Sequence, residues 1–223
     1  DGSLTGGARD ACIRGYETVF HTAALKHVDI LEDAPFESVK TNILGSFNVA
    51  NACMNSGVKN YVFFTTDKAV DPINVYGQCK AISEKLIIDL KHKNPKVNVN
   101  IYRWGNVIGS QGSSVPYFVK CIKEHRPINM TDLDMTRFYL KIDDAVRFVM
   151  RTFPEPRSEI LIPPNIKAAS NRSILTALSV LIGIPYEYNI VGLRAGEKIH
   201  EILVSEEEIS RTYIRDSYYV IAS

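Results

Sequence analysis

The sequence predicts an α/β fold in which helices cover both faces of a parallel β-sheet. Apolar runs typical of buried strands lie at residues 18–22, 61–65 and 97–102. Helical patterns of about 20 residues separate these runs, and strands that alternate with helices form βαβ units. After residue 153, prolines at 154, 156, 163, 164 and 185 interrupt a smaller region. The expected fold class is therefore a doubly wound parallel sheet with a smaller C-terminal region.

The two long helices of this prediction follow from side-chain periodicity and from end signals. Residues 35–56 carry apolar side chains at helical spacing and end at Asn55-Ser56-Gly57. Residues 74–93 form the second helix, which ends before Pro95. Its inward face is expected to carry Ile82, Leu86, Ile87 and Leu90. A flexible loop is predicted at 109–114, and shorter helices at 115–124, 143–152 and 173–182.

Composition excludes several classes of partner. The hydrophobic content of 45% is enough for a packed core, and 26 Lys and Arg residues balance 25 Asp and Glu residues. Without a charge excess, neither a nucleic acid nor an anionic membrane is an expected partner. No apolar run approaches the roughly 20 residues that span a bilayer, and no signal peptide is recognisable, so we expect a cytoplasmic location. Four scattered cysteines show no metal-binding spacing, and no metal is expected.

The segment 65–80 carries the strongest chemical signal. It follows an apolar strand and places Tyr76 and Lys80 one helical turn apart, on a common face. A lysine ammonium beside a phenol lowers the phenol pKa from about 10, which favours proton exchange with a sugar hydroxyl. Asp67 and Lys68 add a second acid–base pair. By themselves these residues could also be a solvated turn pair and an exposed tyrosine beside a lysine.

Other segments accompany this motif in a fixed order. They are His21-Thr22-Ala23-Ala24-Leu25-Lys26-His27-Val28, Lys40-Thr41-Asn42-Ile43-Leu44-Gly45, Arg103-Trp104-Gly105-Asn106-Val107-Ile108-Gly109-Ser110, Asp134-Met135-Thr136-Arg137-Phe138 and Leu193-Arg194-Ala195-Gly196-Glu197-Lys198. With them, the chain resembles the extended short-chain dehydrogenase/reductase superfamily, with a Rossmann-like sheet. Within it, the chain resembles the UDP-N-acetylglucosamine 4,6-dehydratases of bacterial polysaccharide and flagellin-glycan synthesis. The resemblance runs from about Tyr16 to about Ser205.

The first residues do not match the opening of a dinucleotide-binding fold. Such a fold begins with a strand, a glycine-rich turn and a helix, and the amides of the turn hold the pyrophosphate. Thr5-Gly6-Gly7 lacks the later glycines and follows no apolar strand. We expect a short helix at residues 8–14. By comparison with the family, about 65 to 75 residues with the first strands and the phosphate turn are expected to be missing.

The resemblance implies a dehydration with three chemical parts. Tyr76, with Lys80 beside it, would take the proton of the sugar 4-hydroxyl while hydride passes from C4 to a tightly bound NADP or NAD. Lys68 would remove the C5 proton, which the 4-ketone acidifies, and Asp67 would protonate the departing 6-hydroxyl. Hydride would then return to C6 and regenerate the cofactor, with or without inversion at C5. Thr66 would hydrogen-bond the reacting hydroxyl, although it could also merely cap the strand.

The resemblance also assigns binding residues. The expected cofactor-binding residues are Ala23, Ala24, Lys26, Asn42, Thr65, Tyr76, Lys80, Asn106 and Val107. The expected substrate-binding residues are Thr66, Asn106, Gln111, Gly112, Ser113, Val115, Pro116, Arg137, Arg194 and Glu197. Arginine suits a UDP-sugar because its planar fork meets two phosphate oxygens at once. Arg194 is followed by Ala195 where the family has proline, so its loop is expected to be less rigid.

The expected organisation has four parts. Residues 1–108 would form the remainder of an NAD(P)-binding Rossmann domain, 109–140 a substrate loop and lid, 141–155 a helix that returns to the Rossmann domain, and 156–223 a UDP-sugar-binding region. A homo-oligomer is expected. Two alternatives remain: a UDP-sugar 4-epimerase, which needs Tyr76 and Lys80 but not the Asp67–Lys68 pair, and a non-catalytic sugar-nucleotide-binding protein.

Overall fold

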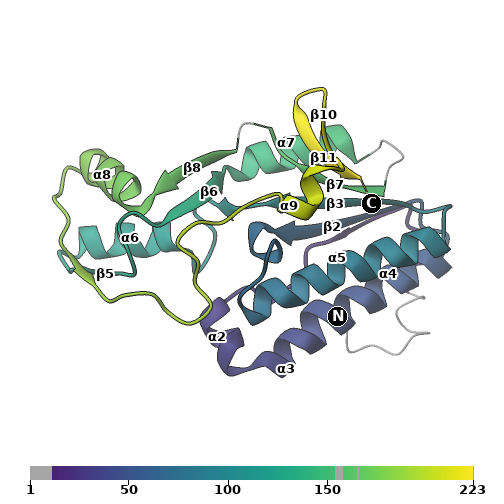
Figure 1. The fold of residues 1–223 in the computed structure, drawn as a ribbon, viewed down its shortest axis with the longest axis horizontal. Coiled ribbons are helices and arrows are strands. Elements are labelled where there is room, and N and C mark those ends of the chain that lie inside the picture. The colour runs from purple at the N-terminus through teal and green to yellow at the C-terminus, as the bar shows by residue number, and fades with distance from the viewer. Residues whose placement is uncertain (1–11, 154–157, 165, 223) are drawn as a thin grey trace.

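The computed structural model describes residues 12–153, 158–164 and 166–222, in a layered body with a smaller lobe on the left of Figure 1. The glycine turn predicted at residues 5–7 lies outside the described residues, as does most of the short helix predicted at 8–14. The helices of the described residues include none that is long and apolar enough to cross a membrane.

The central sheet confirms the predicted fold class. Its strand order is β1-β2-β3-β7-β11-β10, and β1 (Thr18–His21), β2 (Asn60–Thr66), β3 (Asn98–Trp104) and β7 (Ser158–Ile162) run parallel. β11 (Tyr218–Ala222) and β10 (Thr212–Arg215) continue the sheet in antiparallel pairing. Because β7, β10 and β11 belong to this sheet, the predicted division at residue 156 is corrected: the C-terminal strands complete the body of the molecule.

One face of the sheet is covered by a helical layer, at the bottom of Figure 1. It contains α2 (Val28–Asp33), α3 (Pro35–Ser38), the π-helical segment η1 (Val39–Gly45), α4 (Ser46–Asn55) and α5 (Val75–Lys93). The predicted helix at 35–56 is thus a continuous helical run with a π-helical middle, and Gly57 ends it at a φ of 78°. The core under this layer includes Ala50, Tyr61, Phe63, Ile87 and Ile101.

The buried face of α5 differs from the prediction. Ile82 is 46% exposed, whereas Ser83 and Glu84 are buried. The Ser83 hydroxyl donates to the Asn42 carbonyl oxygen at 2.6 Å, and Glu84 pairs with Arg103 on β3. Polar side chains therefore lie on the inward face of this helix because each has a buried partner there.

The other face of the sheet packs against α7 (Ile142–Thr152). Phe148 and Val149 of this helix contact Tyr102 and Tyr218 of the sheet. The Phe148 ring meets Tyr102 edge-on, with ring centroids 5.6 Å apart.

The smaller lobe holds a separate apolar cluster. Its elements are β4 (Asn106–Val107), α6 (Ser114–Lys123), β5 (Ile128–Met130), β6 (Thr136–Leu140), β8 (Lys167–Ser170), α8 (Asn171–Ile182) and β9 (Tyr188–Ile190). Phe118, Ile128 and Leu175 are central to the cluster. The chain leaves the carboxyl end of β3 and enters the lobe through β4, which pairs with β6. The lobe therefore lies beyond the carboxyl end of the central sheet.

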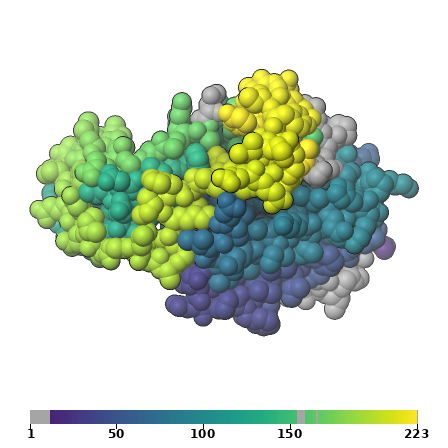
Figure 2. All heavy atoms as spheres, viewed as in Figure 1, coloured from purple at the N-terminus to yellow at the C-terminus, as the bar shows by residue number. Residues whose placement is uncertain are grey.

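Residues 191–205, called the C-terminal segment below, connect the lobe to α9 (Glu206–Ile209) and cross the junction between the lobe and the body in Figure 2. Arg103, which is 2% exposed, anchors this segment to the body. Its guanidinium pairs with Glu84 of α5 at 2.7 Å and with Glu208 of α9 at 2.8 Å. It also donates to the Leu203 carbonyl oxygen at 3.0 Å. One buried cation thus joins β3, α5 and the C-terminal segment.

Candidate active site

The candidate site begins where β2 ends and the chain turns into α5. Thr66 accepts a hydrogen bond from the Lys68 amide and so caps the short 3₁₀ turn η2 (Asp67–Ala69). Asn74 caps α5 by accepting from the Gly77 amide at 2.7 Å. A Cβ at Gly77 would collide with the Lys68 carbonyl oxygen. Glycine at this position therefore lets the first turn of α5 pack directly on η2.

Asp67 and Lys68 form an ion pair at this turn. The Lys68 ammonium lies 3.0 Å from Asp67 Oδ1, which also accepts from the Thr66 hydroxyl at 3.0 Å. Asp67 is fully buried, and its second oxygen, Oδ2, has no hydrogen-bond partner among the described residues. A second acceptor of the Lys68 ammonium is Asn106 Oδ1, at 3.4 Å. The Asp67–Lys68 pair is thus held in place, and Asp67 Oδ2 can still accept a hydrogen bond.

Tyr76 and Lys80 lie one turn apart on α5, but their electrostatics differ from the prediction. The Lys80 ammonium donates to the Phe64 carbonyl oxygen at 2.7 Å and lies 4.2 Å from the centre of the Phe63 ring. Burial raises the pKa of Tyr76 well above its usual value, and the Asp67 carboxylate adds to the rise; the Thr66 hydroxyl opposes it. Burial lowers the pKa of Lys80 to about 8. The expected lowering of the Tyr76 pKa by Lys80 is therefore wrong for this structure, because burial and Asp67 dominate.

Two cavities meet at this turn. The larger has a volume of about 720 Å³ and lies between the body and the lobe, with Lys68, Asn106, Arg137, Arg194 and Glu197 in its wall. The smaller, of about 370 Å³, is lined by Thr65, Thr66, Tyr76 and Val107 among others. Lys68, Asn106, Gly112 and Ser113 line both cavities. Molecules bound in the two cavities would therefore meet at Lys68, whereas Asp67 is buried behind it and lines neither cavity.

Most of the predicted substrate-binding residues come together in the larger cavity. Gly112, Ser113 and Pro116 line it together with the residues named above. Thr66 lines the smaller cavity instead. Val115 lines a separate groove behind α6, and Gln111 is exposed outside the lining of either cavity. From the 109–114 loop, Gly112, Ser113 and Ser114 rather than Gln111 thus line the larger cavity.

The two predicted phosphate-binding arginines have different surroundings. Arg137 donates to the carbonyl oxygens of Thr136, Ile199 and Lys198, at 2.7, 3.1 and 2.9 Å. It therefore fixes the backbone of the C-terminal segment while it lines the cavity. Arg194 is exposed on its loop, and its amide donates to Glu197 Oε2 at 3.1 Å. The side chain of Arg194 remains the more adaptable cation of the two.

The predicted cofactor-binding residues separate into two groups. Lys26, Thr65, Tyr76, Asn106 and Val107 line the smaller cavity. The Thr65 hydroxyl is buried in this wall without a hydrogen-bond partner among the described residues, so it has a free donor and acceptor for a ligand. The residues thus fit a polar, ribose-bearing cofactor.

The second group lies away from that wall. Ala23 and Ala24 are exposed just beyond β1. Asn42 is fully buried, and its amide exchanges hydrogen bonds with the Leu25 backbone, both at 2.9 Å. It therefore holds the segment that follows β1, at the cost of a polar side chain in a helix.

Sequence reasoning missed part of the larger cavity wall. Glu201 lines it, is 6% exposed as a whole residue, and has a carboxylate oxygen 3.6 Å from the Lys68 ammonium. Thr131, which follows β5, and Asn171, the first residue of α8, also line it. These residues lie outside the motifs that the sequence analysis used, so no local signal pointed to them. Their roles follow only from the packing of the lobe.

Comparison with known proteins places this site in context. A family model described as polysaccharide biosynthesis protein matches residues 9–223. A protein of Campylobacter jejuni named UDP-N-acetylglucosamine 4,6-dehydratase (inverting) is 40% identical over 218 residues, which are 95% of this chain and 63% of that protein. A protein of Rickettsia felis named UDP-glucose 4-epimerase is 36% identical over 215 residues, again 95% of this chain and 63% of the relative. The chain therefore spans just under two thirds of these relatives.

Solved structures share the fold. The X-ray structure of Pen from Bacillus thuringiensis superposes with a TM-score of 0.91 at 30% identity, over 98% of this chain and 68% of that one. The dTDP-glucose 4,6-dehydratase DesIV from Streptomyces venezuelae, solved with NAD and DAU bound, gives a TM-score of 0.80 at 22% identity, over 89% and 68% of the two chains. The second likeness is one of fold alone.

Proposed function

The chain belongs to the polysaccharide biosynthesis protein family, and from this premise we propose that the full-length protein removes water from UDP-N-acetylglucosamine to give a UDP-4-keto-6-deoxy-hexosamine. The observation that carries the proposal is the Asp67–Lys68 pair, 3.0 Å apart, whose lysine lines both cavities while the aspartate is buried behind it. An elimination across C5 and C6 needs one group that removes a proton and another that protonates the leaving hydroxyl. The similarity to the Campylobacter protein supports the same substrate.

The residues of the site have separate tasks in this reaction. Tyr76 takes the proton of the 4-hydroxyl, helped by Thr66 at the same wall. Transfer of a proton from the Lys68 ammonium to Asp67, 3.0 Å away, leaves a neutral amine that removes the C5 proton, which the 4-ketone acidifies; the protonated Asp67 then gives its proton to the 6-hydroxyl as it leaves. Arg194 and Glu197 hold the nucleotide in the larger cavity. The raised pKa of Tyr76 keeps its phenol protonated in this structure, so proton uptake at neutral pH would need the positive charge of a bound oxidised nicotinamide to favour the phenolate.

A nicotinamide cofactor is part of the proposal. NADP or NAD would be held by Thr65, Asn106 and Val107 in the smaller cavity, and it would accept a hydride from C4 and return one to C6. The unpartnered Thr65 hydroxyl is the feature of this chain that supports such a ligand. Lys80 would support the Tyr76 side of the cofactor site from α5.

Location and assembly complete the proposal. The four cysteines are free thiols, as in a reducing compartment, which supports a cytoplasmic enzyme. Ile30, Phe36 and Leu44 are exposed on the α2–α4 layer, which supports a homo-oligomer that covers them.

A 4-epimerase is the second candidate. It is favoured by the relatives named UDP-glucose 4-epimerase, at 36% identity. An epimerase needs Tyr76 and the cofactor but no acid for a leaving hydroxyl. The buried Asp67 beside Lys68 therefore favours the dehydratase. The same intact set of groups argues against a protein that only binds sugar nucleotides.

Mass spectrometry of the product decides between these functions. The full-length protein is incubated with UDP-N-acetylglucosamine, and we expect a product that has lost one water and shows a 4-ketone in proton NMR. Tyr76→Phe is the control, since it keeps the ring but removes the proton acceptor. A product of unchanged mass with galacto configuration would support the epimerase, and binding without any product would support the non-catalytic alternative.

A further inference from the structure

A chain of four alternating charges runs from the C-terminal segment to the acid–base pair. The Lys198 ammonium lies 3.6 Å from Glu201 Oε2, and Glu201 Oε1 lies 3.6 Å from the Lys68 ammonium. Lys68 in turn lies 3.0 Å from Asp67. The Glu201 carboxylate is 2% exposed, so its charge is compensated by the two lysines rather than by water. Glu201 is thus the link between Lys68 and the C-terminal segment.

The backbone on both sides of Glu201 is fixed by buried or half-buried donors. Arg137 donates to the carbonyl oxygens of Lys198 and Ile199, and the Thr136 amide donates to that of Ile199 at 3.0 Å. Two residues after Glu201, Arg103 donates to the Leu203 carbonyl oxygen. The Lys198 ammonium is itself held by the Val70 carbonyl oxygen at 2.7 Å. Glu201 is therefore presented from a segment that is tied to β3, to β6 and to the end of η2.

The Lys68 ammonium has three polar partners, two through hydrogen bonds and Glu201 through an ion pair, and two of the three come from other parts of the chain. Asp67 is its sequence neighbour, whereas Asn106 follows β3 and Glu201 lies in the C-terminal segment. A lysine ammonium stands at the end of a flexible four-carbon side chain, so it is held in one position only by the groups that it contacts. Of these partners, Glu201 is the one that is charged and brought from a distance.

We infer that Glu201 is a positioning residue for Lys68: it holds the side-chain nitrogen at the point where the two cavities meet, so that the amine formed when Lys68 gives its proton to Asp67 is aimed at C5 of the sugar. This inference rests on the proposed dehydration. Glu201 acts through Lys68, and the loss of its charge should slow removal of the C5 proton while binding of the nucleotide and oxidation at C4 continue.

The test uses hydrogen–deuterium exchange at C5, because this exchange reports removal of the C5 proton by Lys68 separately from hydride transfer. The full-length enzyme is mixed in D₂O with its own 4-keto-6-deoxy product, and deuterium at C5 is followed by NMR after subtraction of exchange without enzyme. For Glu201→Gln we expect C5 exchange and kcat to fall roughly 10- to 100-fold, as for other small misplacements of a catalytic group. The KM for UDP-N-acetylglucosamine and the affinity for UDP should stay within about twofold, since Glu201 makes no contribution to the nucleotide in this inference.

Three further variants separate positioning from loss of structure. Glu207→Gln removes a charge from an exposed residue of α9 and should leave exchange unchanged. Glu201→Asp keeps the charge and should recover part of the exchange rate. Lys198→Gln removes the far end of the charge chain and should lower exchange less than Glu201→Gln does. Melting temperatures identify any variant that is poorly folded, and Lys198→Gln then carries the test.

The outcomes distinguish this inference from the proposed function. A wild-type protein that releases no water from UDP-N-acetylglucosamine would overturn both. A wild-type dehydratase whose Glu201→Gln variant is folded and exchanges C5 at the normal rate would overturn only the role of Glu201. A parallel fall in C5 exchange and in UDP affinity would also overturn it, because that result would show a structural role in the whole cavity.

Discussion

Two buried charge clusters in this molecule each place a cation between two carboxylates but are built differently. Around Arg103, the guanidinium donates to both oxygens of Glu84, at 3.3 and 2.7 Å, and to both oxygens of Glu208, at 2.8 and 2.9 Å. Around Lys68, the charged atoms are 3.0 to 3.6 Å apart. There, Asp67 Oδ2 and Glu201 Oε2 have no hydrogen-bond partner among the described residues.

The difference teaches how to recognise a structural and a reactive cluster. A buried charge is tolerated only when its hydrogen-bonding capacity is used, and the Arg103 cluster uses all of it. It lies away from both cavities and ties three elements together. The Lys68 cluster lies at the wall of both cavities and keeps unused acceptor atoms. Such spare capacity is costly in a folded protein and is useful where a substrate completes it.

The largest expected effect concerns the reactive cluster. Asp67→Asn keeps the Oδ1 acceptor for Thr66 and Lys68 but removes the acid, so kcat for water loss should fall roughly 10²- to 10⁴-fold. The free energy of unfolding should change by less than about 1 kcal/mol, because an amide is cheaper to bury than a carboxylate. Product mass and urea denaturation measure the two quantities. Asp71→Asn, at an exposed residue nearby, is the control, and turnover within tenfold of wild type in Asp67→Asn would contradict the assignment.

In the Arg103 cluster, removal of a charge should lower the stability of the fold. Arg103→Met leaves the carboxylates of Glu84 and Glu208 buried without their cation and should lower the free energy of unfolding by about 3–5 kcal/mol. Arg172→Met removes a pair with Asp134 in which the side chains are 53% and 78% exposed. It should cost less than about 1 kcal/mol. Equal losses in the two variants, measured by urea denaturation, would remove the distinction between this cluster and a surface ion pair.

A third buried polar group extends the comparison to pH. Burial and the nearby Lys80 ammonium lower the pKa of His21 from 6.5 to about 4, and its Nδ1 lies 2.7 Å from the Tyr61 hydroxyl. The unfolded chain therefore binds a proton at higher pH than the folded one. The stability that neutral His21 contributes is complete above pH 6.5 and is lost as the pH falls through about 4, by up to about 3 kcal/mol.

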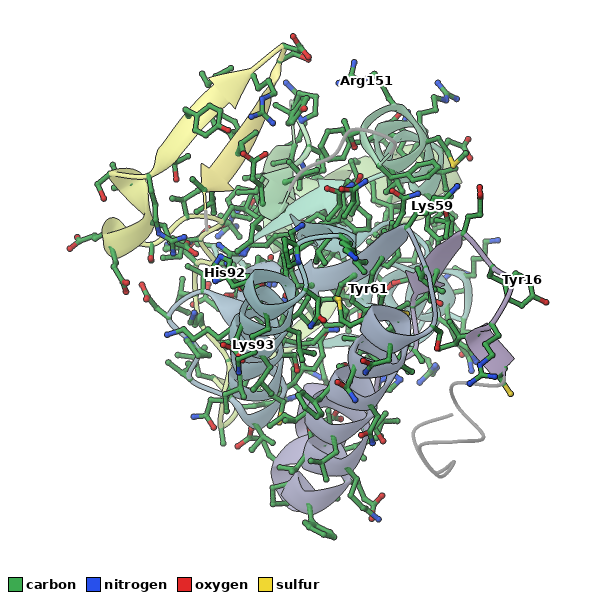
Figure 3. All side chains as sticks on the ribbon, turned by 90° about the vertical axis from the view of Figure 1, so that its right-hand side faces the viewer. Tyr16, Lys59, Tyr61, His92, Lys93 and Arg151 are labelled. Atoms are coloured by element: carbon green, nitrogen blue, oxygen red, sulfur yellow. The ribbon has the colours of Figure 1, made fainter. Side chains whose placement is uncertain are left out.

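Comparison of two histidine variants isolates this contribution. His21→Gln should flatten the fall of the unfolding free energy between pH 6.5 and 4, whereas His92→Gln should leave it unchanged. Figure 3 shows Tyr61, the partner of His21, in the interior, and His92 at the end of α5. A profile that keeps its slope in His21→Gln would assign the acid sensitivity to other groups.

The smallest expected effect lies at the edge of the structural cluster. Ser205 caps α9 in a capping box with Glu208, and the same glutamate pairs with Arg103. Ser205→Ala should cost about 1 kcal/mol, because Arg103 still orients Glu208 when the cap is lost. The measurement is again urea denaturation. A loss as large as that of Arg103→Met would show that the cap, and not the arginine, holds the C-terminal segment.

The groups of the proposed site were readable from the sequence because they are local. Thr65 and Thr66 end β2, Asp67, Lys68 and Tyr76 follow within ten positions, and a short turn brings neighbours in sequence together in space. The strands were readable for a related reason: in a buried parallel sheet they are continuous apolar runs. The electrostatics of Tyr76 and Lys80 were not readable, since burial and the direction of a lysine side chain depend on the surrounding fold.

The sequence by itself thus determined the α/β class, the parallel strands, the ends of the long helices and the chemical groups at the end of β2, because each depends on neighbours along the chain. Only the tertiary structure decided that the last strands complete the central sheet, that Ser83 and Glu84 rather than Ile82 are buried, and that Glu201 reaches Lys68. These features join residues that are far apart in sequence. The free energy that each of these contacts costs or contributes depends on partners that packing brings together, and no local sequence pattern predicts those partners.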